Sequence, residues 1–400
     1  MLYQYVALQN NQKVKGEMEA SSEKEIADYL KSNGYFPVEI QEKKKSQISN
    51  FASMFERVAF QDIVYMTRQF AIMLDAGLTL IDSIDIIKKQ VSKAPLKKML
   101  DEIDRQLRDG KTFSQALTQY PGQFSNFYIA LVRSGEASGK LDEILEKLAE
   151  HLELQRAFKQ RIRNALIYPI VIMSAMFVMM FVMFAFVMPK LLSLYDSFQV
   201  ELPQSTLIIM AISKFMEQYW LWVFIGIIAF IITIIKLLKT KAGKYFFDKY
   251  IFKVPVMGNI VRVSGLVDAT RTLSILISSG VPILDGLLII TDVNSNAMFH
   301  DAFVRIFQKV QKGMSVGSAM SNESIFPESL TQMTIVGEQT GHLDETLLKL
   351  AEYYQTESEM AVKGMLTLLE PMIIVFLGIS VGFLVMAVIT PIFSLTSSLQ

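Results

Sequence analysis

Three long apolar runs constrain the fold of this chain more than any other feature of its sequence. The first covers 165–188, the second 219–235 and the third 366–395, and Glu370 is the one charged residue inside them. About 20 apolar residues are enough for a helix to cross a bilayer. Core helices of soluble proteins rarely run this long without a polar face. We therefore predict transmembrane helices at 165–189, 219–238 and 366–395.

Composition agrees with a membrane protein and excludes some functions. Charged residues make up 20% of the chain, below the roughly 25% of soluble domains. Lys+Arg and Asp+Glu are both 39, so the basic surplus that nucleic-acid binding needs is absent. Cysteine is absent, which excludes disulfides and cysteine-ligated metals. The N-terminus lacks a basic segment followed by an apolar one, so we expect no cleaved signal peptide.

The charges that flank the runs predict how the chain is oriented in the membrane. Basic residues cluster before the first run (Arg156, Lys159, Arg161, Arg163) and after the second (Lys236, Lys239, Lys241, Lys244, Lys249). The loop at 190–218 has only two lysines against three acidic residues. Basic loops stay in the cytoplasm. We therefore expect a cytoplasmic N-terminus, with the loop at 190–218 and the C-terminus on the external, periplasmic side.

An internal repeat organises most of the chain. The segment RQFAIMLDAGLTLID (68–82) matches RTLSILISSGVPILD (271–285), so that Gly77 pairs with Gly280, 203 residues further on. After one deletion the separation becomes 202, and SGEASGKLDE (134–143) matches VGEQTGHLDE (336–345). The repeat continues into the first and third apolar runs. Each unit is therefore a cytoplasmic domain followed by one span, and the second span returns the second copy to the same side.

Within each unit the apolar pattern is helical. Five apolar residues recur at helical spacing after the first GE-x-x-G motif: Leu141, Ile144, Leu145, Leu148 and Leu152. Gly77 and Gly280 are typical of helix C-termini. We expect the next helix to start at Thr79 in the first copy, with Asp82 as its capping partner, and at Pro282 in the second, within the first turn. Each domain, at 55–164 and 258–365, is predicted to be a six-helix bundle.

The first 45 residues differ from the rest. Tyr3, Tyr5 and Ala7 alternate with Gln4 and Val6, and the pattern predicts a hairpin that turns at Asn10–Asn11, followed by a helix at about 22–32. The segment 42–50 has the composition of a linker. The overall prediction is an all-α membrane protein with two repeated cytoplasmic six-helix bundles, three transmembrane helices and a small α+β module at 1–45.

Motifs for catalysis are absent from the sequence. His151, His300 and His342 are the only histidines, and no HExxH, GxSxG, P-loop or GxGxxG motif occurs. We therefore expect no enzyme activity and no cofactor. The repeated GE-x-x-G, Gly135-Glu136-x-x-Gly139 and Gly337-Glu338-x-x-Gly341, is interpreted as a tight turn between packed helices. The alternative is that Glu136 and Glu338 are metal ligands or ion-pair partners at a subunit interface.

Glu370 stands one turn inside the third span, where the first copy has Tyr168. A carboxylate within hydrocarbon is costly and suggests a function. Three interpretations are open: a carboxylate that reaches the interface or pairs with Lys363, a contact between subunits, and a part in ion conduction. A transporter or channel is the competing functional class, although both repeated spans run in the same direction and carry few polar groups at the midplane.

The motifs together resemble the inner-membrane platform protein of type IV pilus and type II secretion machines, the PilC/GspF family. The resemblance is carried by Gly77, Gly135, Glu136, Gly139 and Leu141, by Gly280, Gly337, Glu338, Gly341 and Leu343, and by Glu370, Pro371, Pro391 and Leu202-Pro203. The N-terminal module, through Gly34-Tyr35-x-Pro37, is similar as well. The resemblance covers nearly the whole chain.

The resemblance implies a scaffold of the bacterial inner membrane. Such proteins form homo-oligomers, bind a hexameric cytoplasmic ATPase and other inner-membrane assembly components, and help to move pilin or pseudopilin subunits from the bilayer into a filament. The expected function is therefore non-enzymatic coupling of that ATPase to polymerisation, in pilus biogenesis or protein secretion, with Glu370 and the repeated glycines and glutamates as structural or interaction residues.

Overall fold

The computed structural model describes residues 2–9, 12–20, 23–42, 57–189, 204–294 and 296–398. It confirms the predicted fold class: an all-α architecture with two copies of a six-helix arrangement, three helices that are long and apolar enough to cross a membrane, and a small α+β module at the N-terminus. The linker at 43–50, the turn at Asn10–Asn11 and the pair Leu202-Pro203 lie outside the described residues.

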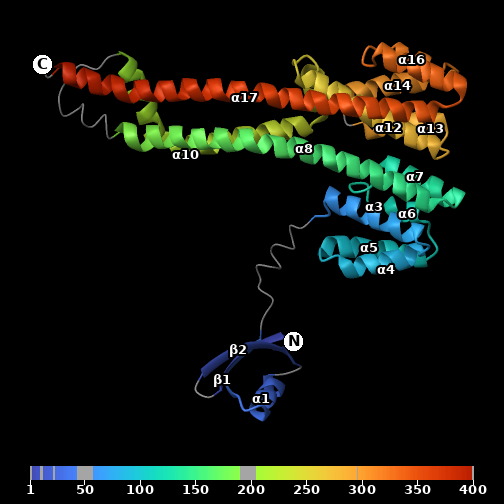
Figure 1. The fold of residues 1–400 in the computed structure, drawn as a ribbon, viewed down its shortest axis with the longest axis horizontal. Coiled ribbons are helices and arrows are strands. Elements are labelled where there is room, and N and C mark those ends of the chain that lie inside the picture. Colours follow the sequence, from blue (N-terminus) through green and yellow to red (C-terminus); the bar gives the residue numbers. More distant parts are fainter. Residues whose placement is uncertain are drawn as a thin grey trace.

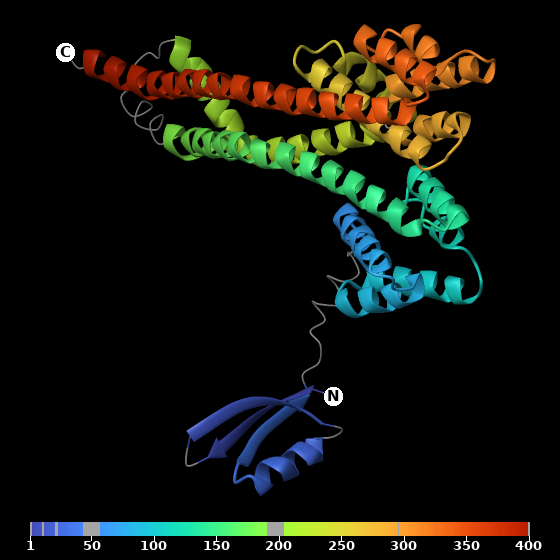
Figure 2. The same ribbon diagram turned by 45° about the vertical axis from the view of Figure 1, so that its right-hand side comes forward.

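The N-terminal module is a three-stranded antiparallel sheet with one helix. Strands β1 (Leu2–Gln9), β2 (Gln12–Glu19) and β3 (Phe36–Glu42) follow the order β2-β1-β3, and α1 (Glu23–Ser32) packs on the sheet. The sequence predicted the hairpin and the helix but missed β3. The module has its own small core of Tyr3, Ala7, Ile26 and Leu30, and it lies apart from the bundles in both views (Figures 1 and 2).

The first bundle contains six helices. They are α3 (Phe60–Asp75), α4 (Leu80–Gln90), α5 (Ala94–Arg108), α6 (Phe113–Leu117), α7 (Asn126–Ser138) and α8 (Leu141–Val182). Helix α8 begins in the bundle, where Ile144, Leu145 and Leu148 are buried. It then continues without interruption through the first apolar run and into a π-helical turn, η1 (Met183–Val187).

The second bundle repeats this order. Its helices are α12 (Met257–Ser278), α13 (Ile283–Val293), α14 (Ala297–Gln311), α15 (Val316–Ser321), α16 (Glu328–Thr340) and α17 (Leu343–Ser398). Between the two copies stand α10 (Gln204–Lys239), which carries the second apolar run, and the short α11 (Lys241–Ile251). Helix α10 begins at Gln204, within the stretch 190–218 that the sequence assigned to an external loop, and its apolar span begins at Leu221.

Three helices have the length and hydropathy of membrane spans, in agreement with the sequence. They are the continuous helix over Leu141–Val187, the segment Leu221–Leu238 of α10, and Leu343–Phe383 of α17. Their apolar stretches are almost entirely on the surface, since at most 11% of the apolar window of each is buried by protein. Such a surface is stable only in a bilayer.

Both bundles lie at the same end of the long helices. In Figure 1 they stand on the right, while α8, α10 and α17 run side by side to the left. Figure 2 gives the same arrangement from a second direction. The buried apolar residues of the two bundles form one continuous core cluster, which includes Phe70 and Leu145 from the first and Leu276 and Phe303 from the second. The two copies are therefore packed together.

Candidate functional site at the junction of the two repeats

The repeated glutamates cap a helix in each copy. Glu136 accepts hydrogen bonds from the backbone N–H groups of Phe113 and Ser114, at the start of α6. Glu338 accepts bonds of 3.0 and 3.1 Å from Val316 and Gly317, at the start of α15. The first N–H groups of a helix have no partner within it and carry partial positive charge, which a carboxylate satisfies. Both oxygens of each carboxylate are used in this way.

The glycines of the motif have two separate roles. Gly139 and Gly341 end α7 and α16 in the left-handed conformation, at φ 73° and 74°, which glycine adopts without steric cost. Gly135 and Gly337 lie inside those helices. A Cβ at Gly135 would lie 3.1 Å from Leu141 Cα, and one at Gly337 would lie 2.7 Å from Thr346 Oγ1. The prediction of one tight turn was therefore wrong for the first glycine of each motif, which allows close helix packing.

The turn after the first helix of each bundle, at Gly77 and Gly280, follows the sequence prediction with one correction. Gly77 and Gly280 follow α3 and α12 with φ 86° and 79°. Thr79 is the N-cap of α4, where its hydroxyl accepts the Asp82 N–H at 3.2 Å and donates to the Asp82 carboxylate at 2.6 Å. Pro282 is the N-cap residue of α13 and not part of its first turn, because the helix begins at Ile283.

Glu370 and Pro371 lie in the middle of α17, far from the repeated glutamates in sequence. Helix α17 continues through Pro371 without a break. The Glu370 side chain is exposed, and it forms no ion pair with Lys363 among the residues that the structure describes. The structure thus places Glu370 on the exposed surface of α17, and does not bring it near Glu136 or Glu338.

Polar contacts join the two bundles across the junction. The Asn126 side-chain amide donates to Asp292 at 3.0 Å. The Ser134 hydroxyl donates to the Ser279 carbonyl oxygen at 2.6 Å, and Lys147 donates to the Ser278 hydroxyl at 3.1 Å. These bonds come from α7 and α8 on one side and from α12 and α13 on the other. The junction is a specific contact, held in one register by side chains.

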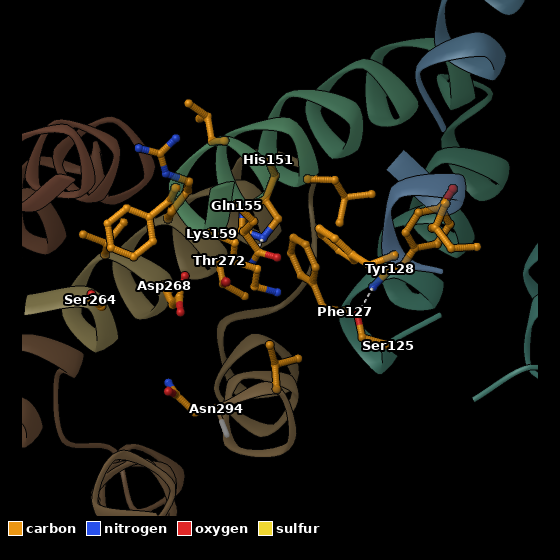
Figure 3. A pocket seen from close by; sticks show the side chains of 18 of the residues that line it. Ser125, Phe127, Tyr128, His151, Gln155, Lys159, Ser264, Asp268, Thr272 and Asn294 are labelled. Atoms are coloured by element: carbon orange, nitrogen blue, oxygen red, sulfur yellow. Dashed lines mark hydrogen bonds between the residues drawn. The ribbon is translucent and has the colours of Figure 1, made fainter. Parts of the chain in front are cut away.

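A cavity of about 510 Å³ lies in this junction. Figure 3 shows its walls: His151 and Gln155 from α8, Ser125 and Phe127 from the start of α7, and residues of α12 and α13 opposite them. Its polar lining residues include Lys159, Asp268, Arg271, Thr272 and Asn294. Sequence reasoning did not predict this cavity, because its residues belong to no motif and come from both copies.

Burial shifts the pKa of the ionisable groups around the cavity. Burial and the charge of Arg271 lower the pKa of His151 to about 4. The imidazole Nε2 lies 3.1 Å from the Gln155 amide nitrogen, while Nδ1 is buried without a partner. Asp268 is exposed where it lines the cavity, and desolvation by the surrounding protein raises its pKa to about 6. At neutral pH, His151 is uncharged.

Arg271 is the most unusual of these groups. Its side chain is buried, its Nε has no hydrogen-bond partner, and burial lowers its pKa. The corresponding residue of the first copy, Arg68, bonds to Glu146 and, at 2.8 and 2.7 Å, to Glu153. A comparison of the copies could have revealed this, since the sequence has Leu348 and Gln355 where the first copy has those glutamates.

The repeated glutamates serve as helix caps in the structure. Over the described ranges, no group of three or more His, Cys, Asp or Glu side chains is placed to hold a metal ion. Glu136 and Glu338, the candidate metal ligands, lie in separate bundles and both engage backbone N–H groups. The chemistry of the junction is that of a polar interface between two rigid helical bundles.

Comparison with known proteins agrees with the duplicated architecture. The family model for type II secretion system (T2SS) protein F matches twice, at 66–189 and 269–391. The model for the N-terminal domain of type II secretion system protein F matches 1–41. The two long matches correspond to the two units found from the sequence, each a bundle and its following span.

Curated relatives match along nearly their whole length. The chain is 34% identical over 371 residues to the type IV pilus assembly protein PilC of Pseudomonas aeruginosa, covering 92% of this chain and 98% of the relative. It is 34% identical to PilC of Myxococcus xanthus over 96% of this chain and 93% of the relative. It is 28% identical to the type II secretion system protein F of Vibrio cholerae, over 96% of this chain and 95% of the relative. With two matches to its model and these relatives, the chain belongs to the type II secretion system protein F family, the PilC/GspF family.

Proposed function

We propose that this chain is a non-enzymatic platform protein of the bacterial inner membrane. It couples a cytoplasmic assembly ATPase to the polymerisation of pilin or pseudopilin subunits, in type IV pilus biogenesis or type II secretion. The names of its relatives describe assembly and secretion components, and three apolar helices fit a multi-pass inner-membrane protein. The charge distribution favours a cytoplasmic N-terminus and an external C-terminus.

One observation carries this proposal. Helices α8 and α17 each begin in the core of a bundle and run unbroken into an apolar span. A helix is stiff over this length, so a rotation or tilt of a bundle is transmitted to the span. Both bundles stand at the same end of the spans (Figure 1), where one motor can contact both. The partners are then the ATPase, pilin subunits, other inner-membrane components and further copies of the chain.

The experiment that tests this coupling interrupts the two helices between bundle and span. Gln160 on α8 and Gly364 on α17 are both exposed, so proline at either position removes a backbone hydrogen bond and kinks the helix between bundle and span without disturbing a core. We expect Gln160→Pro and Gly364→Pro to reach the membrane at normal levels and still co-purify with the ATPase, but to abolish filament assembly or secretion in cells that lack the natural chain.

The matched controls are Gln160→Ala and Gly364→Ala, which keep the helices continuous and should restore function. Full activity of the proline variants would refute mechanical coupling through these helices. Absence of any ATPase contact by the unmodified chain, with filaments or secretion intact after its deletion, would refute the platform function itself.

A further inference from the structure

Helix α11 exposes aromatic side chains where a soluble helix has polar ones. Tyr245, Phe246, Phe247 and Tyr250 are 44%, 63%, 48% and 49% exposed. They occupy a helix of 11 residues, KAGKYFFDKYI, and nothing among the described residues covers them. Large exposed apolar patches mark interaction sites, and aromatic side chains with lysines between them are typical of helices at a membrane interface.

The second bundle fixes which way this helix faces. Asp248, its one acidic residue, is turned inward, and its carboxylate accepts the Ala297 N–H at 2.8 Å at the start of α14. Phe246 and Tyr250, two residues before and two residues after Asp248, therefore point away from the bundle, whereas Tyr245 lies on the same helix face as Asp248. Thr240 caps α11 by accepting the Gly243 N–H at 3.1 Å. A Cβ at Gly243 would lie 2.1 Å from the Leu237 carbonyl oxygen, so the chain turns tightly between the span and α11.

The charge of this region is strongly positive. Six lysines occur between 236 and 253, and Asp248 is the only acidic residue there: Lys236, Lys239, Lys241, Lys244, Lys249 and Lys253. The side chains of Lys236, Lys244, Lys249 and Lys253 are exposed and form no ion pair within the described part of the chain. Clusters of lysine next to a transmembrane helix are attracted to anionic lipid headgroups.

The position of α11 matches the edge of the bilayer. It follows the span Leu221–Leu238 after two residues. The loop after it continues the apolar surface, with Val254, Val256 and Met257 exposed. Helix α12 then starts, and its Ile260 packs with Val362 and Met365 of α17, just before the third apolar run begins at Leu366. Both ends of this segment thus lie at the boundary between bundle and span.

From these observations we infer that α11 and the adjoining segment Val254–Met257, which ends at the first residue of α12, form a membrane-binding surface. The aromatic side chains enter the interfacial layer of the leaflet on the side of the bundles, and the lysines bind anionic lipid headgroups. The surface holds the second bundle against the bilayer, so that α12 and α14 keep a fixed height above it. This inference depends on α10 crossing the membrane, and not on the proposed coupling to an ATPase.

The absence of cysteine allows a direct test in the full chain. Phe246→Cys carries a nitroxide label on the proposed surface, and Tyr353→Cys is the matched control, since Tyr353 is 58% exposed on α17 within the second bundle. Each protein is placed in nanodiscs of phosphatidylcholine alone or with one third phosphatidylglycerol. The measurement is the collision rate of the label with a water-soluble nickel chelate and with oxygen.

With phosphatidylglycerol, we expect the label at 246 to meet nickel several-fold less, and oxygen several-fold more, than the label at 353. Lys244→Gln, Lys249→Gln and Lys253→Gln combined should reduce this difference several-fold. Equal nickel accessibility at 246 and 353 in both lipid mixtures would overturn the inference. If the label at 246 were equally protected from nickel with and without phosphatidylglycerol, the assignment to anionic lipid would be overturned. Dipolar broadening between labels would show that the surface contacts a second copy of the chain instead.

Discussion

The two bundles have the same backbone but different charges. In the first, Arg68 is held by Glu146 and Glu153, and Lys88 bonds to Asp101 at 2.8 Å and Asp104 at 3.1 Å. In the second, the positions that match Lys88, Asp101 and Asp104 are Thr291, Val304 and Phe307. Arg271 is buried, and its Nε has no hydrogen-bond partner among the described residues. The face that is ionic in one copy is largely apolar in the other.

This difference separates two kinds of residue. Those that fix the backbone are repeated: the left-handed glycines, the capping glutamates and the N-cap hydroxyls of Thr112 and Ser315. Those that set surface charge and fill the junction are not. The two copies therefore share one scaffold but carry different charges on its surface.

The largest effect is expected where the copies differ at a close contact. Gly317 in the second bundle corresponds to Ser114 in the first. A Cβ at Gly317 would lie 2.6 Å from the Ile335 backbone nitrogen, and that helix must shift to make room. We expect Gly317→Ser to cost about 3 kcal/mol of stability, as overpacking does, measured as a lower Tm by circular dichroism of the purified protein.

The reverse exchange is the control. Ser114→Gly keeps the N–H that Glu136 accepts and removes only a small side chain. Its cost should be about 0.5–1 kcal/mol, the usual cost of glycine in a helix. Equal losses from the two exchanges would show that the copies are packed alike at this point.

The capping glutamates should give a somewhat smaller effect that is the same in both copies. Each carboxylate accepts two backbone hydrogen bonds, so Glu136→Ala and Glu338→Ala should each cost about 2 kcal/mol. Glu143→Ala, which removes only an exposed pair with Lys140, should cost less than about 0.5 kcal/mol. A loss confined to one copy would contradict the common role.

The same cap makes a prediction about metal removal. Because backbone N–H groups engage both oxygens of Glu136 and of Glu338, we expect a chelator such as EDTA to leave the Tm of the unmodified chain unchanged. A lower Tm in EDTA, restored by a divalent cation and lost in Glu136→Ala, would instead support the hypothesis of a metal site.

Substitution of the two matching arginines, Arg68 and Arg271, should affect stability differently. Arg68→Met leaves Glu146 and Glu153 without their shared cation and should cost about 1 kcal/mol. Arg271→Met replaces a buried cation that has no hydrogen-bonded carboxylate with an apolar side chain of similar length, and should leave stability unchanged or raise it by about 1 kcal/mol. A loss of stability from both changes, measured by Tm in the same buffer, would mean that Arg271 has a partner in solution.

The smallest expected effect is the change of stability with pH that arises at the junction. It is small because the contributions of Asp268 and His151 change in opposite directions as the pH rises. The pKa of Asp268 is raised to about 6, so its contribution to stability falls as the pH rises from about 4 to 6. The pKa of His151 is lowered to about 4, so its contribution rises as the pH rises from about 4 to 6.5. Because the two contributions oppose each other, these two groups should change the stability of the unmodified chain little between about pH 4 and 6.5.

Single substitutions should expose each group. Relative to the unmodified chain, the Tm of Asp268→Asn should rise with pH between 4 and 6.5, and that of His151→Gln should fall. Measurements at constant ionic strength would test this. Parallel curves for both variants and the unmodified chain would refute the assigned shifts.

The sequence by itself determined the features that depend on local chemistry. Hydrophobic length specified three spans, the repeat specified two equivalent bundles, and Gly77, Gly139 and their partners marked helix ends, since the left-handed conformation depends on one residue. The 3.6-residue period at 141–152 indicated that the repeated units are helical. These properties are set within one turn or one span of the chain.

Only the tertiary structure decided which distant residues meet. Strand β3 was missed because its pairing with β1 depends on contacts about 35 residues apart in the sequence. Glu136 reaches a helix that starts 23 residues earlier, and His151, Asp268 and Arg271 share a cavity across both copies. No local pattern encodes such contacts, because each depends on how whole helices pack. Packing also turned Asp248 inward and left aromatic side chains of α11 exposed.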